Sequence, residues 1–520
     1  MKATLSRNYK SKSAALRDQL NHPVVDADGH TVEFEPGVLD YLKDIAGSEA
    51  VDRYKSSPEG AFIFPWNHMT ERERLEWREF RPVWWGHPMR NTLDRATSTL
   101  PGLLHSRMDE FGLDFAIIYP SLGMFATELW DGELRLAVCR AFNKYHADIF
   151  REFSDRLTPV AVIPMHTPEE AIAELEYVVK MLGMKAVMLP TSTRRPIPAL
   201  ERKYAEIKGR LYWLDNHCVD SIYDYDPVWA KCVELRVAPT FHSVCLGMSS
   251  RTAVSNFVFN HLGHFAEAGQ TAARALFMGG VARRFPQLRF AFLEGGVAWG
   301  CELYNDIFMD WRTRNARFIP ALDPANFDER LFADLCATHG GSFFTARLAR
   351  MKEGMDASDL IAGPRNVGPS LDEFARCGIA KESDIRDLFV SHFYFGCEGE
   401  DHSVGYAYDS QKNPLNARLN AMFGSDIGHF DVPDMSEAVS EAYGLVERGV
   451  ITKDDFRDFV FTNPVELHAE VNPEFFKGTA IEGAVERLLA DRANKPHADS
   501  CVSRSPRAEV TIQAPVADGR

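Results

Sequence analysis

The sequence predicts an α/β fold: a (β/α)8 TIM-type barrel with long helical insertions after its first and sixth strands. The first observation is a series of eight short, nearly continuous apolar runs, each ending in glycine, proline or a polar residue. Such runs are typical of parallel strands that are buried on both faces. The second observation is that amphipathic segments, such as 168–182 and 271–284, separate the runs. Eight strands alternating with helices favour a barrel over a doubly wound sheet.

The eight predicted strands follow one another along the whole chain. In order they are Val24–His30, Phe115–Ser121, Val160–Met165, Ala186–Thr191, Ala238–Ser243, Phe290–Gly296, Phe393–Glu400 and Ala421–Gly428. We expect a leader at 1–22, the barrel with its insertions at 23–484, and a partly disordered polar tail at 485–520.

Two connections are too long for simple barrel loops. The segment 46–104 carries Trp66, Trp77, Trp84 and Trp85, and the segment 303–380 is rich in Phe, Arg and Met. Long insertions after barrel strands build the rim of the active-site mouth. Their aromatic content is consistent with a lid over an apolar substrate, and equally with an extra helical layer or a dimer interface.

Composition and charge narrow the class of protein. Hydrophobic residues make up 45% of the 520 residues and charged residues 25%, which is ordinary for a globular protein. The net charge of −16 repels phosphate backbones, so we expect no nucleic-acid partner. The nine cysteines form no CxxC pair, and no apolar run is long enough to span a membrane. We therefore expect a cytoplasmic, homo-oligomeric protein, a dimer, that acts on a small molecule.

The end of the first strand carries a concentration of metal-binding side chains. Alternation along a strand predicts that Asp26, Asp28 and His30 point the same way. Carboxylate and imidazole ligands suit divalent cations such as Zn²⁺, Fe²⁺ or Mn²⁺. The alternative is a structural acidic turn with His30 as a capping residue.

Further candidate ligands stand at the ends of four other strands. The carboxyl ends of barrel strands all face the same mouth, so these side chains should meet there. They are His242 on the fifth strand, Glu294 on the sixth, Glu398, Glu400 and Asp401 on the seventh, and Asp426 followed by His429 on the eighth. Their combination predicts a centre of one or two divalent metal ions. Asp426 is placed to take a proton from an attacking water, unless it serves only to cap the following segment.

These motifs together resemble the amidohydrolase superfamily. The similarity rests on Asp26-x-Asp28-x-His30, on His242, on the run from Phe292 to Trp299, and on Gly424-Ser425-Asp426. The segment 107–114, Tyr119-Pro120-Ser121 and Asn463-Pro464 support it, so that it covers roughly 24–481. The most similar branch is the one that includes aminocarboxymuconate-semialdehyde decarboxylase. The resemblance implies a metal-dependent barrel with Asp28, His30, His242 and Asp426 as ligands, and Asp426 as the catalytic base.

The chain departs from the family pattern at two positions. Asp28 stands where the family usually has histidine, and Glu294 stands where the decarboxylase branch usually has one. The added negative charge favours a second cation, for which Glu294 could be the bridge and His261 or His264 a ligand. These two histidines could equally orient other ligands or pack at a helix start. No lysine ends the fourth strand, so a carbamylated-lysine bridge is not expected.

Three functions fit these features. The first is a metal-dependent hydrolase of an amide, ester or thioester of a bulky apolar or aromatic substrate, with Asp426 and Glu294 as catalytic residues. The alternative is a metal-dependent, non-oxidative decarboxylase of an aromatic or unsaturated acid, against which the charge of Glu294 argues. The third is an inactive barrel that binds or scaffolds, which the presence of Asp28, His30, His242 and Asp426 together disfavours.

Overall fold

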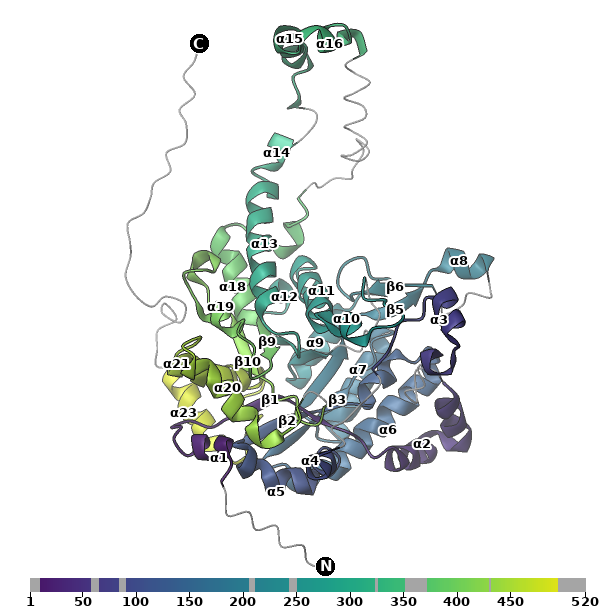
Figure 1. The fold of residues 1–520 in the computed structure, drawn as a ribbon, viewed down its shortest axis with the longest axis vertical. Coiled ribbons are helices and arrows are strands. Elements are labelled where there is room, and N and C mark those ends of the chain that lie inside the picture. Colours follow the sequence, from purple (N-terminus) through teal and green to yellow (C-terminus); the bar gives the residue numbers. More distant parts are fainter. Residues whose placement is uncertain are drawn as a thin grey trace, which may run out of the picture.

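The computed structural model describes residues 10–57, 65–83, 90–204, 211–242, 250–322, 326–350, 372–429 and 432–493. Eight parallel strands form one sheet that curls into a nearly closed barrel, which confirms the predicted fold (Figure 1). Neighbours along the sheet follow in the order β1 Val25–Thr31, β2 Phe115–Pro120, β3 Leu157–Val162, β4 Ala186–Pro190, β7 Pro239–His242, β8 Phe290–Phe292, β9 Phe393–Cys397 and β10 Asn420–Phe423.

The first and last strands meet through backbone contacts just beyond the regular ladder. The amide of Asp426 donates to the carbonyl of Asp28 (2.9 Å), and the amide of His30 donates to the carbonyl of Ile427 (2.8 Å). These two bonds join segments that are nearly 400 residues apart. They place the end of β10 directly beside the end of β1.

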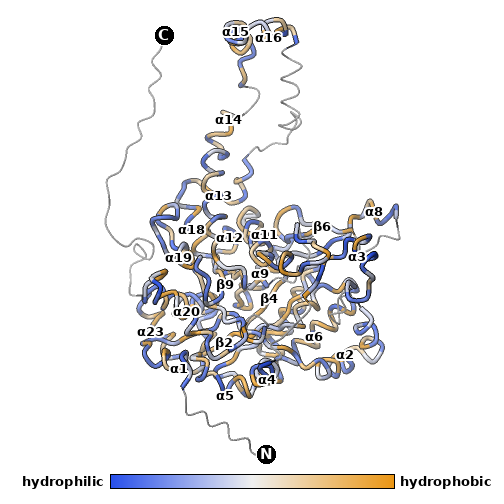
Figure 2. Tube along the Cα trace, in the orientation of Figure 1, coloured by the Kyte–Doolittle hydropathy of each residue, from blue (hydrophilic) through white to orange (hydrophobic). Residues whose placement is uncertain are grey.

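Helices surround the strands on the outside (Figure 1). Hydrophobic segments concentrate on the central strands and hydrophilic ones on the periphery (Figure 2). The longer helices are α2 Glu35–Ser56, α5 Pro101–Phe111, α6 Gly132–Phe150, α7 Pro168–Glu176, α9 Asp226–Leu235, α11 His264–Met278, α13 Ala298–Arg314, α18 Glu382–His392, α20 Ala438–Glu447, α22 Asn463–Ala469 and α23 Glu482–Ala493. The shorter ones are α1 Lys12–Arg17, α4 Thr92–Thr97, α10 Phe257–His261, α12 Val281–Arg284, α19 Val404–Tyr408 and α21 Lys453–Arg457.

The core beneath the candidate site is built from aromatic strand residues. Phe290 and Phe292 of β8 each lie against Phe393 of β9, with ring centroids 6.1 and 5.5 Å apart. Trp299 of α13 packs edge-on to Phe292 at 5.6 Å. All four side chains are buried, which explains why these strands are continuously apolar in sequence.

The first insertion packs beside the segment that follows β7. It contains η1 Pro65–His68 and α3 Glu71–Trp77. The indole of Trp66 donates to the carbonyl of Val254 (2.7 Å), and the amide of Arg81 donates to the carbonyl of Ala253 (2.8 Å). Trp77 is 55% exposed, whereas Trp84 and Trp85 lie outside the described residues. The insertion therefore adds to the rim on the β7 side.

The second insertion forms an arm that stands away from the barrel (Figure 1). It continues α13 through α14 Ile319–Leu322, α15 Glu329–His339 and α16 Gly341–Thr345. Seven of its large hydrophobic side chains are exposed, namely Phe318, Phe327, Leu331, Phe332, Leu335, Phe343 and Phe344. Residues 351–371 of the predicted insertion lie outside the described residues.

A small antiparallel hairpin follows β4 outside the barrel sheet. Its strands are β5 Thr193–Pro196 and β6 Tyr212–Asp215, and α8 Pro198–Lys203 lies between them. Near the C-terminus, α23 includes residues 485–493 of the expected tail, and Arg492 forms an ion pair with the buried Glu466 (2.5 Å). The rest of that tail is not among the described residues. None of the described helices is long and apolar enough to cross a membrane.

Candidate metal centre

Strand β1 contributes Asp28 and His30 to the centre. The side chains are 3% and 0% exposed, and Nε2 of His30 lies 3.5 Å from Oδ1 of Asp28. Asp26 has a different role from the one that strict alternation predicts, because the register with β2 shifts between Asp26 and Gly29. Its carboxylate accepts hydrogen bonds from the amide (2.9 Å) and hydroxyl (2.5 Å) of Ser425. Asp26 therefore holds the chain that leads to Asp426.

Strands β7 and β8 contribute His242 and Glu294. Nε2 of His242 lies 2.9 Å from Oε2 of Glu294, 3.3 Å from Nε2 of His30 and 4.0 Å from Oδ1 of Asp28. Both side chains are buried. Glu294 follows the end of β8 by two residues, where its φ of +59° turns the backbone out of the strand conformation. This turn is why β8 is shorter than the predicted run Phe290–Gly296.

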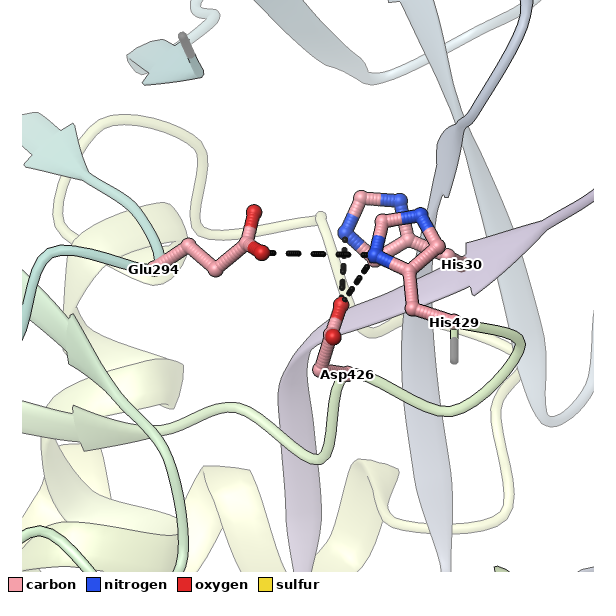
Figure 3. A group of neighbouring side chains, drawn as sticks. All are labelled: His30, Glu294, Asp426 and His429. Carbon is pink, nitrogen blue, oxygen red and sulfur yellow. Dashed lines mark ion pairs between the residues drawn. The ribbon is translucent and has the colours of Figure 1, made fainter. Parts of the chain in front are cut away.

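The segment after β10 contributes Asp426 and His429. Oδ1 of Asp426 lies 3.3 Å from Nε2 of His30 and 2.7 Å from Nδ1 of His429 (Figure 3). The His429 ring stacks on the His30 ring, with centroids 3.8 Å apart. Asp426 has a φ of +49°, a conformation that costs energy in a residue with a Cβ and that is often found at functional sites.

Two glycines allow this close approach of β10 to β1. A Cβ at Gly424 would lie 2.7 Å from the Cβ of Asp28. Gly428 has a φ of +103°, and a Cβ there would lie 2.8 Å from the carbonyl oxygen of His30. No larger side chain fits at either position without displacing a candidate ligand.

The side chains form two groups that are able to hold a metal ion. Asp28, His30 and His242 form one group, and His30, Glu294, Asp426 and His429 form the other; in each group the ligand atoms lie within 4.8 Å of one another. The donors are imidazole nitrogens and carboxylate oxygens, the set that suits Mn²⁺, Fe²⁺ or Zn²⁺. The fold thus brings these side chains together at the strand ends.

A divalent cation fits the electrostatics of the centre. Oδ1 of Asp28 is buried and has no hydrogen-bond partner among the described residues, which is costly for a carboxylate. Burial raises the pKa of the Asp28 carboxyl well above its usual range, with His242 opposing and Glu294 adding to the rise. Burial, together with His429 and His242, lowers the pKa of His30 well below its usual range. A bound cation would stabilise both the carboxylate and the neutral imidazole.

The remaining predicted ligands lie outside both groups. His264, at the start of α11, points Nδ1 at the carbonyl of His261 (3.0 Å), and burial lowers its pKa to about 4. The His261 ring is tilted against His264 and lies edge-on to Phe265, and the Phe265 ring lies edge-on to His242. Phe265 therefore lies between His242 and these two histidines, which do not belong to either group. Glu400 and Asp401 of the seventh strand also lie outside the groups, as does Glu398, whose charge contributes to the raised pKa of Asp28.

From the sequence, His429 is noted only as a polar residue at the end of the eighth strand, and Ser121 only as part of a motif that supports the family resemblance; neither is assigned as a metal ligand or a catalytic residue. The hydroxyl of Ser121, directly after β2, lies 3.0 Å from Nε2 of His429. The only sequence signal for either residue is its place immediately beyond a strand end. That signal is weak by itself, because most polar residues at such positions have structural roles.

Comparison with known proteins assigns the family. A sequence model of amidohydrolases matches residues 83–347, just over half of the chain. The chain therefore belongs to the amidohydrolase family. The matched region contains His242 and Glu294 but neither the β1 pair nor Asp426.

Similar solved structures include an amidohydrolase from Mycobacterium avium subsp. paratuberculosis K-10, with 15% identity over 86% of this chain and 99% of that one and a TM-score of 0.48. The 5-carboxyvanillate decarboxylase LigW from Sphingomonas paucimobilis has 15% identity over 86% and 98%, with a TM-score of 0.45. A dihydroxybenzoic acid decarboxylase from Polaromonas sp. JS666, crystallised with manganese and 2-nitroresorcinol, has 16% identity over 88% and 99%, with a TM-score of 0.43. A search of curated proteins finds no match.

Proposed function

We propose that the centre holds one divalent cation, bound by Asp28, His30, His242 and Asp426, with Glu294 beside it. The reason for one cation is that both groups of candidate ligands share Nε2 of His30. An imidazole nitrogen has a single lone pair, so it serves one metal at a time. The donor atoms around it lie 3.3–3.5 Å away. Ligands of one ion, each about 2.1 Å from it, are spaced about 3 Å or more apart.

We further propose that the reaction is the non-oxidative decarboxylation of an aromatic or unsaturated carboxylic acid. The observation that carries this proposal is the 2.7 Å contact between Asp426 and His429 in a buried centre. At this distance the two groups are able to share one proton, and Asp426 itself is buried. Loss of CO2 leaves an electron pair on carbon that must take up one proton. A site with a positioned proton donor meets that need.

The charge of Glu294 no longer argues against this reaction. Its Oε2 lies 2.9 Å from Nε2 of His242, and its Oε1 lies 4.0 Å from Nδ1 of His429. Both carboxylate oxygens therefore face imidazoles of the centre. The negative charge is directed at the ligand cluster, which reduces its repulsion of a substrate carboxylate.

The roles of the chain follow from these contacts. A cation bound at the centre would supply positive charge to anchor a substrate oxygen and draw electrons from the breaking bond. The C–C bond to the carboxyl group breaks, CO2 departs, and the electron pair remains on carbon. The proton held between Oδ1 of Asp426 and Nδ1 of His429 then forms the new C–H bond, and a proton from solvent restores the pair before the next turnover. His30 and His242, neutral and buried, hold the centre in place.

Hydrolysis of an amide, ester or thioester is the second candidate. It is favoured by the position of Asp426, whose carboxylate is able to take a proton as well as to give one. The same contact with His429 would then stabilise the protonated acid. In this reaction water would cleave the acyl bond and release a bulky apolar or aromatic acid.

Product analysis separates the two reactions. Protein loaded with Mn²⁺ is incubated in D2O with aromatic and unsaturated acids, among them 5-carboxyvanillate and 2,6-dihydroxybenzoate, and with aryl esters, amides and thioesters. We expect CO2 release with one deuterium at the carbon that lost it. Release of acid from the esters, amides or thioesters without any CO2 would replace decarboxylation by hydrolysis.

A further inference from the structure

We infer that Ser121 is a positioning residue, which holds His429 against Asp426 and thereby keeps Asp426 in place for the cation. Ser121, His429 and Asp426 form a chain of contacts across the end of the barrel. The serine hydroxyl lies 3.0 Å from Nε2 of His429, and Nδ1 of His429 lies 2.7 Å from Oδ1 of Asp426. The inference deepens the proposed function, because it takes the metal centre as given. It does not depend on which reaction the centre performs.

The distances indicate that His429 supports the centre without binding the ion. Nε2 faces Ser121, so only Nδ1 is directed at the other donors. Two ligands of one ion, each about 2.1 Å from it, lie about 3 Å apart or more. A separation of 2.7 Å instead matches an N–H donor and a charged carboxylate acceptor. Nδ1–H of His429 therefore donates to Asp426, and Nε2 accepts the proton of the Ser121 hydroxyl.

Contacts with His30 and Ser121 help to hold the His429 ring in this orientation. The first is the stack on His30, with an interplanar angle of 27°, which sets the plane of the ring. A stack leaves the ring free to turn within that plane, or to exchange its two nitrogens by a flip. The Ser121 hydroxyl is the contact that sets which nitrogen faces Asp426. In many metal sites, a hydrogen bond to one ring nitrogen of a histidine decides which tautomer the ring adopts.

The position of Ser121 is itself rigid. The residue is 8% exposed, and its amide donates to the carbonyl of Thr31 at the end of β1 (3.0 Å). The hydroxyl therefore comes from the paired ends of β1 and β2. The chain of contacts thus joins the ends of three strands, β1, β2 and β10, around one carboxylate.

The contribution of Ser121 to metal affinity is measured by zinc binding, which needs no substrate. The affinity of the full chain for Zn²⁺ alone is determined by competition with a chromophoric chelator. We expect Ser121→Ala to bind one equivalent about tenfold more weakly, since loss of a supporting contact costs 10- to 100-fold in metal affinity. Ser121→Thr retains the hydroxyl and should bind as the unaltered chain does. Ser106→Ala, which removes an exposed hydroxyl on α5, is the matched control.

Nitrogen-15 spectra of the histidine rings in the zinc-loaded chain give a second measurement. We expect His429 to show the Nδ1–H tautomer in the unaltered chain and a mixture in Ser121→Ala. This readout on the unaltered chain holds even if the alanine variant does not fold, which circular dichroism would reveal. An Nε2–H tautomer, unchanged zinc affinity in Ser121→Ala, or an equal loss in Ser121→Thr would overturn the inference while leaving the proposed reaction intact. An unaltered chain that binds no zinc would overturn both.

Discussion

Nε2 of His30 and Nε2 of His242 lie 3.3 Å apart, although 212 positions separate the two residues in the chain. One comes from β1 and the other from β7, and both rings are buried. This separation is within hydrogen-bond distance, and it also suits two ligands of the cation that we propose. The first prediction follows from this pair.

His30→Ala and His242→Ala should each lose the metal. A site with one fewer ligand binds far more weakly, and we expect each variant to purify with less than about a tenth of the metal in the unaltered protein. Elemental analysis of dialysed protein is the measurement. His105→Ala on α5, whose ring faces Asp155, is the control and should keep its metal. Full metal content in either centre variant would remove that histidine from the ligand set.

Asp426→Asn should keep the fold and lose turnover. Asparagine tolerates a positive φ, so the conformation at φ +49° adds little strain. The amide is unable to exchange a proton with carbon or water, and we expect kcat to fall by about 100-fold or more at saturating metal. The melting temperature and kcat are measured together. Near-normal kcat would mean that Asp426 only caps the segment after β10.

Glu294→Gln tests whether the centre holds one cation or two. With Nε2 of His30 shared by both groups, we expect one equivalent per chain before and after the substitution, with weaker binding in the variant. Titration with Mn²⁺, followed by electron paramagnetic resonance, counts the bound ions. Two equivalents in the unaltered chain, falling to one in Glu294→Gln, would instead establish Glu294 as a bridge between two ions.

Gly424→Ala should damage the centre through sterics alone. The new Cβ would lie 2.7 Å from the Cβ of Asp28, so β10 and β1 must move apart. Overpacking of this kind costs about 1–3 kcal/mol, and it should also weaken metal binding. Thermal unfolding with and without Mn²⁺ is the measurement. Gly483→Ala, at the start of α23, places its Cβ at an ordinary 3.6 Å from a flexible arginine and should be neutral.

The arm α14–α16 should join two copies of the chain. The seven exposed hydrophobic side chains from Phe318 to Phe344 offer roughly 100 Å² each. The sum is close to the roughly 800 Å² per partner that a stable interface buries. Because the arm stands away from its own barrel (Figure 1), we expect the arm of a second copy to cover these side chains, as in two-fold dimers.

Sedimentation velocity of the full chain at micromolar concentration tests this interface. We expect a dimer that dissociates in Leu331→Glu/Leu335→Glu and persists in the control Asp334→Asn on the same helix. A monomeric unaltered chain, or a dimer that survives the double substitution, would show that the arm has another role.

The fold was predictable from sequence because its signal is repeated. Eight apolar runs of strand length are each confirmed as strands in the barrel, since burial on both faces demands continuous apolar residues. The residues Asp28, His30, His242, Glu294 and Asp426 could be selected for a related reason. In a barrel, the carboxyl ends of all strands lie at the same end, and this does not depend on the conformation of the loops.

The tertiary structure decided the details that depend on a single backbone turn or contact. The register shift in β1 directs Asp26 to Ser425, and the positive φ of Glu294 ends β8 early and turns that carboxylate toward His242. His429 and Ser121 meet only because β10 closes against β1, and His261 and His264 fall behind His242 because α10 and α11 set their direction. Periodicity in a sequence reports which residues are buried. The direction of one side chain at a strand end depends instead on local dihedral angles and on neighbours hundreds of residues away, which no local pattern encodes.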